Sequence, residues 1–377
     1  MVQLTTPPQG EPLRLRGVTL PDGERRELFV VDGRISLTPV AGAQTIATDG
    51  FIVPGLVDAH CHVGLAAHGP VDTPAEARDQ AITNRDAGAL LLRDAGVPVR
   101  FTELDDDPEL PRTVHAGRHL APPKGYIRSY AIEVEPDDLP AAVDAQARVA
   151  GLLPPTPGTA AGGWVKLVGD WIDRVAGDLT PNWPAGTLNE AVARAHALGA
   201  RVAVHTFGEE ALPDLLAAGV DSIEHGTGLT DDLVGDMRAR GTALVPTTLV
   251  VDTFESIANQ ASKYPAYADR MRRLRASSRD RLRAAYDAGI PIYVGTDAGG
   301  LPHGQVVEEI LRLADICMPA EEALAAGSWA ARRWLGLPGI EEGAPADLVV
   351  YDEDPRADLK VLRAPRHIVI AGRKVRS

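Results

Sequence analysis

Histidine, lysine and aspartate side chains stand at the ends of several short apolar segments of the chain. His60 and His62 flank Cys61 directly after the apolar residues 56–59, and the alternation of an extended strand would point both imidazoles to one side. Further candidate ligands stand at or just after the ends of later apolar segments: Lys166, His205, His225 and Asp297. A His-x-His pair alone is a weak sign of a metal site. Its combination with residues at matching positions predicts a site for one or two metal ions.

A metal ion held there would support hydrolysis. Coordination to a divalent cation lowers the pKa of water to about 7, so the hydroxide formed would be the nucleophile, and a metal ion would also polarise the carbonyl group under attack. Imidazole and carboxylate ligands suit zinc best, although manganese, cobalt or iron can occupy the same set of ligands.

The elements that must position these residues are strands alternating with helices. Eight short apolar segments are predicted as strands: 56–59, 89–92, 113–116, 164–167, 201–204, 222–224, 243–246 and 292–294. Helical composition and spacing mark the segments 190–198, 209–218, 231–240 and 270–288. This alternation predicts an α/β fold, a (β/α)8 TIM barrel over residues 54–337, with its active site at the carboxyl ends of the strands.

The flanking regions have a different pattern. Residues 12–48 and 345–375 read as short strands joined by turns, which predicts a small β domain composed of residues 1–53 and 338–377. The segment 153–163, rich in proline, glycine and small residues, belongs to a long connection between the third and fourth strands. Such connections often serve as active-site lids.

Composition limits the possible partners. A formal net charge of -14 argues against nucleic acid and anionic lipid, and no apolar run approaches the length needed to span a membrane. The first residues lack the features of a secretory signal, so we expect a cytoplasmic protein with a small-molecule substrate. A homo-oligomer is possible. Cys61 and Cys317 are too few for a disulfide framework and are expected to be reduced.

Five motifs in order resemble the amidohydrolase superfamily, specifically its imidazolonepropionase-like and Xaa-Pro dipeptidase (prolidase)-like branch. They are PGLVDAHCH (54–62), VAVHTFG (202–208), DSIEHG (221–226), GTDAGG (295–300) and GAPADLVVYDEDP (343–355). The resemblance implies a (β/α)8 barrel with a β-sandwich-like domain formed from both termini. It also implies that the metal ligands are His60, His62, His205, His225 and Asp297.

Lys166 bears on the number of metal ions. An ammonium group cannot lie beside two divalent cations, whereas a lysine that has reacted with CO2 becomes an anionic carbamate that can bridge them. Similar binuclear enzymes carry such a lysine at the end of the fourth strand, and WVKLVGD (164–170) places Lys166 there. A lysine paired with Asp170 or Asp173 is the alternative. The mononuclear imidazolonepropionases lack this lysine, so we expect two metal ions and a peptide-like amide substrate.

The predicted reaction assigns roles to further residues. Asp297 would accept the proton of the attacking water and deliver it to the leaving nitrogen, while His225 or His303 would stabilise the developing oxyanion. Candidate substrate residues follow the third and fourth strands, together with His303: Tyr126, Arg128, Tyr130, Trp171 and Arg174. A bidentate pair with Arg128 would suit the carboxylate of a dipeptide or an N-acyl amino acid. Related proteins often carry Gly-Gly-His where this chain has HLAPPKGYIRSY (119–130), which puts inherited substrate assignments in doubt.

Two other functions remain open. One is ring-opening hydrolysis of a cyclic amide, or deamination, at a single metal ion with Lys166 unmodified. The other is a non-catalytic barrel that serves as a scaffold, which is disfavoured because no ligand position is degraded. The remaining histidines are interpreted mainly as structural: His68, His115, His119, His196 and His367.

Overall fold

The computed structural model describes residues 11–150 and 163–376, and they form a mixed α/β fold with two parallel sheets that carry the candidate site. The first sheet contains β6 (Leu56–Cys61), β9 (Ala89–Asp94) and β10 (Arg112–His115). The second contains β12 (Ile132–Glu133), β11 (Leu120–Ala121), β13 (Trp164–Val168), β16 (Arg201–Thr206), β17 (Ser222–His225) and β18 (Ala243–Val245). Seven of the eight predicted strands are therefore confirmed, with small shifts at their ends.

The predicted eighth strand is instead an extended segment that bridges the two sheets. Ile292 forms an isolated parallel bridge with Leu244 of β18, and Tyr293 N donates to Leu244 O at 3.0 Å. On the other side, Ala59 N of β6 donates to Val294 O at 2.8 Å. Because this segment shares its backbone hydrogen bonds between β18 and β6, it joins one edge of each sheet without forming a regular ladder.

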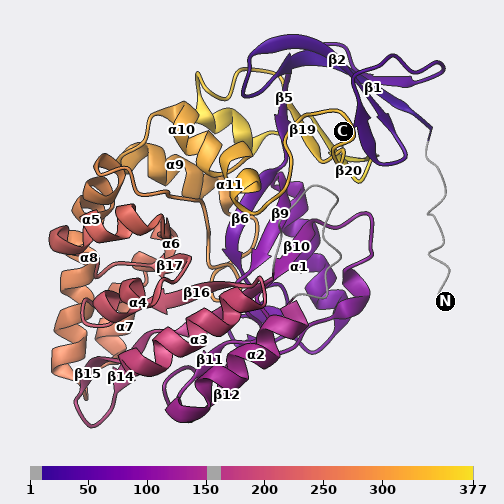
Figure 1. Ribbon diagram of the computed structural model, residues 1–377. Coiled ribbons are helices and arrows are strands. Elements are labelled where there is room, and N and C mark those ends of the chain that lie inside the picture. The colour runs from indigo at the N-terminus through magenta and orange to yellow at the C-terminus, as the bar shows by residue number, and fades with distance from the viewer. Residues whose placement is uncertain (1–10, 151–162, 377) are drawn as a thin grey trace, which may run out of the picture.

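Helices lie between the strands along the chain, as predicted (Figure 1). The helices are α1 (Pro74–Asp86), α2 (Leu139–Ala150), α3 (Ala185–Ala197), α4 (Leu212–Ala218), α5 (Asp231–Arg240), α6 (Thr248–Val251), α7 (Phe254–Gln260), α8 (Pro265–Asp287), α9 (Val306–Ile316), α10 (Ala320–Ala326) and α11 (Trp329–Trp334). Gly219 and Gly241 end α4 and α5 in the left-handed conformation, which glycine adopts without steric cost. No helix in the described part of the chain is long and apolar enough to cross a membrane.

Strands from both ends of the chain share a separate sheet, in which indigo and yellow ribbons lie side by side (Figure 1). Its members are β1 (Leu13–Thr19), β2 (Glu24–Val31), β3 (Arg34–Ser36), β4 (Gln44–Ala47), β5 (Phe51–Pro54), β19 (Leu348–Tyr351), β20 (His367–Ile370) and β21 (Arg373–Arg376). β19 pairs antiparallel with β5, and this ladder connects the two ends. The predicted lid, residues 153–163, lies outside the described residues except for Gly163.

Side chains of the parallel strands are arranged in layers that lead to the candidate site. An apolar cluster includes Trp164 of β13 and Ala203 of β16. Two residues further along each strand, the period-2 alternation places Lys166 and His205 on the same face as these residues. The fold thus carries polar side chains above an apolar layer, toward the carboxyl ends of the strands.

Candidate metal centre

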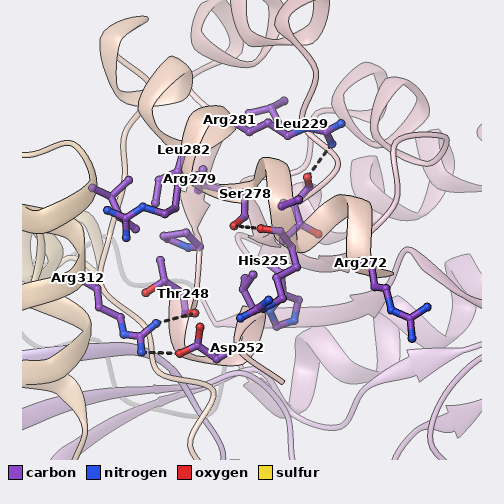
Figure 2. Close-up of a pocket in the computed structure, with 18 residues that line it drawn as sticks. His225, Leu229, Thr248, Asp252, Arg272, Ser278, Arg279, Arg281, Leu282 and Arg312 are labelled. Atoms are coloured by element: carbon purple, nitrogen blue, oxygen red, sulfur yellow. Dashed lines mark hydrogen bonds and ion pairs between the residues drawn. The ribbon is translucent and has the colours of Figure 1, made fainter. Parts of the chain in front are cut away.

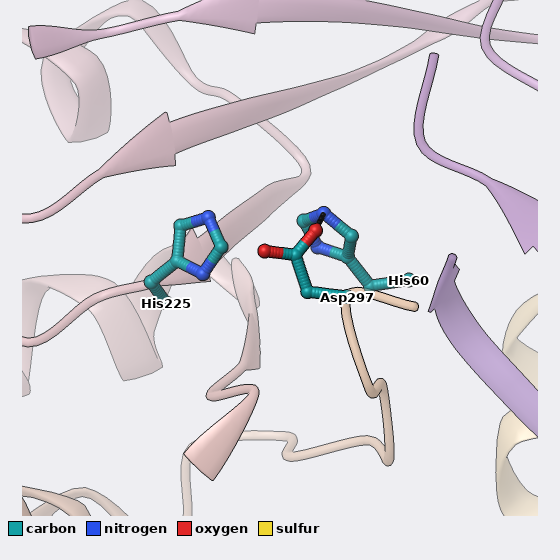
Figure 3. A group of neighbouring side chains, drawn as sticks. All are labelled: His60, His225 and Asp297. Carbon is teal, nitrogen blue, oxygen red and sulfur yellow. Dashed lines mark ion pairs between the residues drawn. The ribbon is translucent and has the colours of Figure 1, made fainter. Parts of the chain in front are cut away.

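Three ligand-type side chains from three separate elements converge at the carboxyl ends of the strands. The ligand atoms of His60, His225 and Asp297 all lie within 4.8 Å of one another, and Figure 3 shows the carboxylate of Asp297 between the two imidazoles. His62 joins this group, because its Nε2 lies 2.8 Å from Asp297 Oδ1, while His60 Nε2 lies 3.3 Å from the same oxygen. This arrangement is a possible site for a metal ion.

The backbone at this site is locally strained. His225 has a φ of 67° and Asp297 a φ of 57°, and Thr247 beside them has a φ of 44°. Residues other than glycine rarely adopt this left-handed region, and such outliers cluster at functional sites where the surroundings hold them in place. The backbone conformation of Asp297 is stabilised by its N–H group, which donates to His60 O at 2.7 Å.

His60 and His62 each have a defined partner for the ring nitrogen Nδ1. His60 Nδ1 lies 2.6 Å from a carboxylate oxygen of Glu224, and His62 Nδ1 lies 2.6 Å from the backbone oxygen of Gly96. Both partners can only accept, so Nδ1 must carry the proton in both rings. In the neutral imidazoles, Nε2 then presents a lone pair toward Asp297, itself an acceptor. Such close acceptors require a cation or a proton between them, so the donor set fits a metal ion.

Glu224 is held by a buried arginine. Arg93 Nη2 lies 2.7 and 2.8 Å from the two carboxylate oxygens of Glu224, and both side chains are fully buried. Burial would raise the pKa of Glu224, but the charge of Arg93 and the hydrogen bond from His60 hold that pKa well below its usual value. Glu224 is therefore an anion beneath His60. The sequence analysis did not single out this pair, although DSIEHG contains Glu224 directly before a predicted ligand.

Lys166 and His205 bring to the same region nitrogen atoms that have no hydrogen-bond partner among the described residues. Lys166 is fully buried, and within the described residues its Nζ has no hydrogen-bond partner. Burial lowers the pKa of Lys166 to about 8, with the charge of Glu224 opposing this shift. The alternative pairing is not observed with Asp170, which instead accepts from the backbone N of Phe207 and of Gly208.

His205 lies at the centre of this region. Its ring centroid is 4.7 Å from that of His225, and its Nε2 also has no hydrogen-bond partner in the described part of the chain. Burial and the neighbouring His225 lower the pKa of His205 well below its usual value, so the ring is neutral and can offer a lone pair. The structure therefore brings the six predicted ligands to one end of the parallel strands.

His119, which the sequence analysis interpreted mainly as structural, lies beside the candidate site. It is 1% exposed, and neither of its ring nitrogens has a hydrogen-bond partner among the described residues. Its ring centroid lies 5.5 Å from that of His62 and 5.1 Å from that of Tyr126. The available signal was its position three residues after the predicted strand 113–116. In the structure it lies directly before β11, which pairs with β12 and β13.

The structure brings some of the predicted substrate residues to the site and leaves others outside. Tyr126 and Trp171 contact each other with ring centroids 4.8 Å apart, and both lie within 5.6 Å of the ring of His205. Tyr130 lies behind Tyr126, 6.5 Å between centroids. Arg128 and Arg174 are exposed. Their contact with substrate stays a prediction.

His303 and two structural histidines have distinct surroundings. His303 Nδ1 lies 3.1 Å from Asn84 Nδ2, and burial lowers the pKa of His303 to about 4. His115 bridges two carboxylates, and His196 pairs with Asp221 at 2.9 Å, which supports their structural interpretation. Both cysteines are free, as expected.

Comparisons with known proteins identify related sequences and folds. The profile of the amidohydrolase family matches residues 171–375. An uncharacterized protein of Mycobacterium tuberculosis (strain ATCC 25618 / H37Rv) is 52% identical over 363 residues, covering 96% of this chain and 95% of the relative. A crystal structure of a Xaa-Pro dipeptidase with bound methionine in the active site is 23% identical, with a TM-score of 0.76 and coverage of 97% of this chain and 100% of that chain. The Aspergillus niger ochratoxinase structure is 19% identical, with a TM-score of 0.78 and coverage of 97% and 96%.

Proposed function

Because the chain belongs to the amidohydrolase family, we propose that it is a metal-dependent hydrolase that cleaves the amide bond of a dipeptide or an N-acyl amino acid. The observation that carries this proposal is the contact between His62 Nε2 and Asp297 Oδ1 at 2.8 Å, in which a neutral imidazole would turn a lone pair toward a carboxylate. A cation between these atoms would satisfy both, and His60 Nε2 faces the same oxygen at 3.3 Å.

We assign the metal ligands by the position of each side chain. His60, His62 and Asp297 would hold one divalent ion, most simply zinc, and His205 and His225 would hold a second. Lys166, once carbamylated by CO2, would contribute to both, and its lowered pKa favours the neutral amine that reacts with CO2. When bound, the metal ions would lower the pKa of a water molecule and polarise the substrate carbonyl.

The chain's own residues would move the proton. Burial would raise the pKa of Asp297, but the neighbouring His60 and His62 hold it well below its usual value, so Asp297 is an ionised carboxylate. Its side chain is 22% exposed, which leaves it accessible to a substrate. Asp297 would take the proton of the attacking water and return it to the leaving nitrogen, since an amine leaves poorly until it is protonated.

Neighbouring rings would bind and orient the substrate. We propose that His119, whose nitrogens lack partners, donates a hydrogen bond to the oxygen of the cleaved carbonyl, alongside the earlier candidates His225 and His303. Tyr126 and Trp171 would form the wall against which the acyl group or amino acid side chain packs. The dipeptidase among the structures of the same fold is consistent with a dipeptide substrate.

The site also depends on the predicted architecture. We propose that residues 54–337 form a (β/α)8 barrel and that residues 1–53 and 338–377 form a β-sandwich-like domain. The hydrogen bonds of the extended segment around Ile292 and Val294 with both parallel sheets support the barrel. The ladder between β5 and β19 supports a domain made from both ends of the chain.

Hydrolysis of a panel of dipeptides and N-acyl amino acids by the metal-loaded protein tests the proposal. We expect turnover of members of this panel, a loss of at least about 100-fold in Asp297→Asn, and restoration by divalent metal after chelation of the wild type. Turnover of cyclic amides alone would favour the mononuclear alternative. No turnover of any amide by a folded, metal-loaded protein would contradict the proposal.

A further inference from the structure

A cavity of about 220 Å³ lies between α8, α9 and the segments that follow β17 and β18 (Figure 2). Its lining is rich in cations, because five arginines contribute to it and Asp252 is its one carboxylate. The arginines are Arg272, Arg275, Arg279, Arg281 and Arg312. Four of them have a carboxylate partner: Arg272 pairs with Glu255 and Asp269, Arg279 with Asp315, Arg281 with Glu209 and Arg312 with Asp252. Within the described residues, Arg275 is left as the lining guanidinium without a carboxylate partner, and it can bind an anion.

Three of these arginines form a row along one face of α8. Arg272, Arg275 and Arg279 are spaced three and four residues apart, so their side chains are neighbours on the helix surface. Within the described residues the guanidinium group of Arg275 has no hydrogen bond or ion pair, and Arg279 pairs with Asp315 where both side chains are more than half exposed. An exposed pair of this kind is weak and exchangeable.

The remaining lining is largely apolar. Leu229, Leu244, Leu282 and Ile316 contribute side chains to the cavity. Neighbouring side chains of a strand point to opposite faces, and Val245 of β18 belongs to the apolar cluster that contains Trp164 and Ala203. Leu244 belongs to another cluster on the opposite, outer face of β18, and the cavity that it lines lies on that face. A volume below the roughly 300–1,000 Å³ of typical ligand pockets suits a small ligand.

We propose that this cavity binds a small monocarboxylate with an apolar body. Its carboxylate would pair with Arg275 and Arg279, whose planar guanidinium groups match carboxylate geometry, and its body would contact the leucine side chains. The inner wall includes His225 and Thr248, and Arg281 Nη1 donates to Thr227 O at 2.7 Å. A bound carboxylate would therefore lie against the segment that carries His225. This site goes beyond the proposed hydrolysis and does not depend on it.

Calorimetric titration of the full-length protein with phenylacetate tests the proposal. We expect saturable binding that weakens at least about tenfold in Arg275→Gln, because a charged hydrogen-bonding group is lost. Arg273→Gln is the matched control, since Arg273 is exposed on the same helix but does not line the cavity. It should bind phenylacetate like the wild type. A thermal melt of each variant checks that it is folded, and Arg279→Gln provides a second test of the same face.

Three results would overturn the proposal. One is the absence of phenylacetate binding to the wild type. Another is that Arg275→Gln and Arg279→Gln bind phenylacetate as tightly as the wild type, while Asp297→Asn loses this binding. That result would place the ligand at the candidate metal centre instead. The third is inorganic phosphate binding as tightly as phenylacetate, which would show that charge alone is selected and that the apolar lining plays no part.

Discussion

Replacing Glu224 by glutamine would test how the buried charges support the candidate metal centre. Glu224 accepts from His60 Nδ1 at 2.6 Å and from Arg93 Nη2 at 2.7 and 2.8 Å, and all three side chains are buried. In Glu224→Gln the shape is kept but the negative charge is lost. Arg93 then remains as a buried cation without its counterion, and His60 Nδ1 loses a charged acceptor.

The size of both effects follows from these contacts. Removing one partner of a buried ion pair costs roughly 3–5 kcal/mol, so we expect the free energy of unfolding of the metal-free protein to fall by about that amount. Losing the partner of a ligating histidine weakens metal binding by about 10–100-fold. The second effect is the informative one, because a purely structural role would not produce it.

Chemical denaturation and competition with a metal chelator measure the two quantities separately. Asp347→Asn is the matched control: Asp347 is fully buried and pairs with Arg112 at 2.8 Å, with the buried Arg332 3.6 Å away. Among the described residues it forms no hydrogen bond or ion pair with the candidate ligands. This variant should lose stability while keeping the metal affinity of the wild type. If Glu224→Gln, folded at the assay temperature, also binds metal as tightly as the wild type, the inferred link from Glu224 through His60 is wrong.

Three further predictions concern Lys166, His119 and His303. Lys166→Met should keep or gain stability without metal, because it removes a buried amine that has no partner, yet it should lose at least one metal ion; unchanged metal content would rule out a ligand role. His119→Phe should retain metal and stability but reduce turnover by about 100-fold, and unaltered steady-state rates would exclude His119 from substrate binding. His303 has a folded-state pKa of about 4, below the value of about 6.5 in an unfolded chain, so the unfolded state binds more protons between these pH values. Its contribution to stability is present above pH 6.5 and is lost as pH falls toward 4; denaturation of His303→Asn should show a shallower fall over this window, and parallel pH profiles would refute the assignment.

Much of the site could be predicted because ligand positions follow the period of the strands. Lys166 and His205 lie two residues beyond inward-facing Trp164 and Ala203, and simple alternation places them correctly. His225 and Asp297 could be predicted as candidates from their place after apolar segments and from the family resemblance, but not from strand alternation. Their left-handed backbone conformations change the direction of the side chains in a way that alternation does not describe.

Other features depend on contacts between distant parts of the sequence. Arg93 and Glu224 are 131 residues apart, and nothing in either local segment indicates that they form an ion pair. The eighth predicted strand had a suitable apolar composition, but its hydrogen bonds are divided between β18 and β6, so no regular ladder forms. The position of His119 likewise depends on its contacts with the rings of His62 and Tyr126, which the local sequence does not indicate.

Metal content per chain, measured together with intact mass under conditions that preserve bound CO2, tests the central claim most directly. The account predicts about two divalent ions per chain and a mass gain of one CO2 that disappears in Lys166→Met. One metal ion with an unmodified lysine would contradict the binuclear assignment and favour cyclic-amide hydrolysis or deamination. A folded protein that binds no metal would contradict the metal-dependent hydrolase itself and return the non-catalytic scaffold as the better explanation.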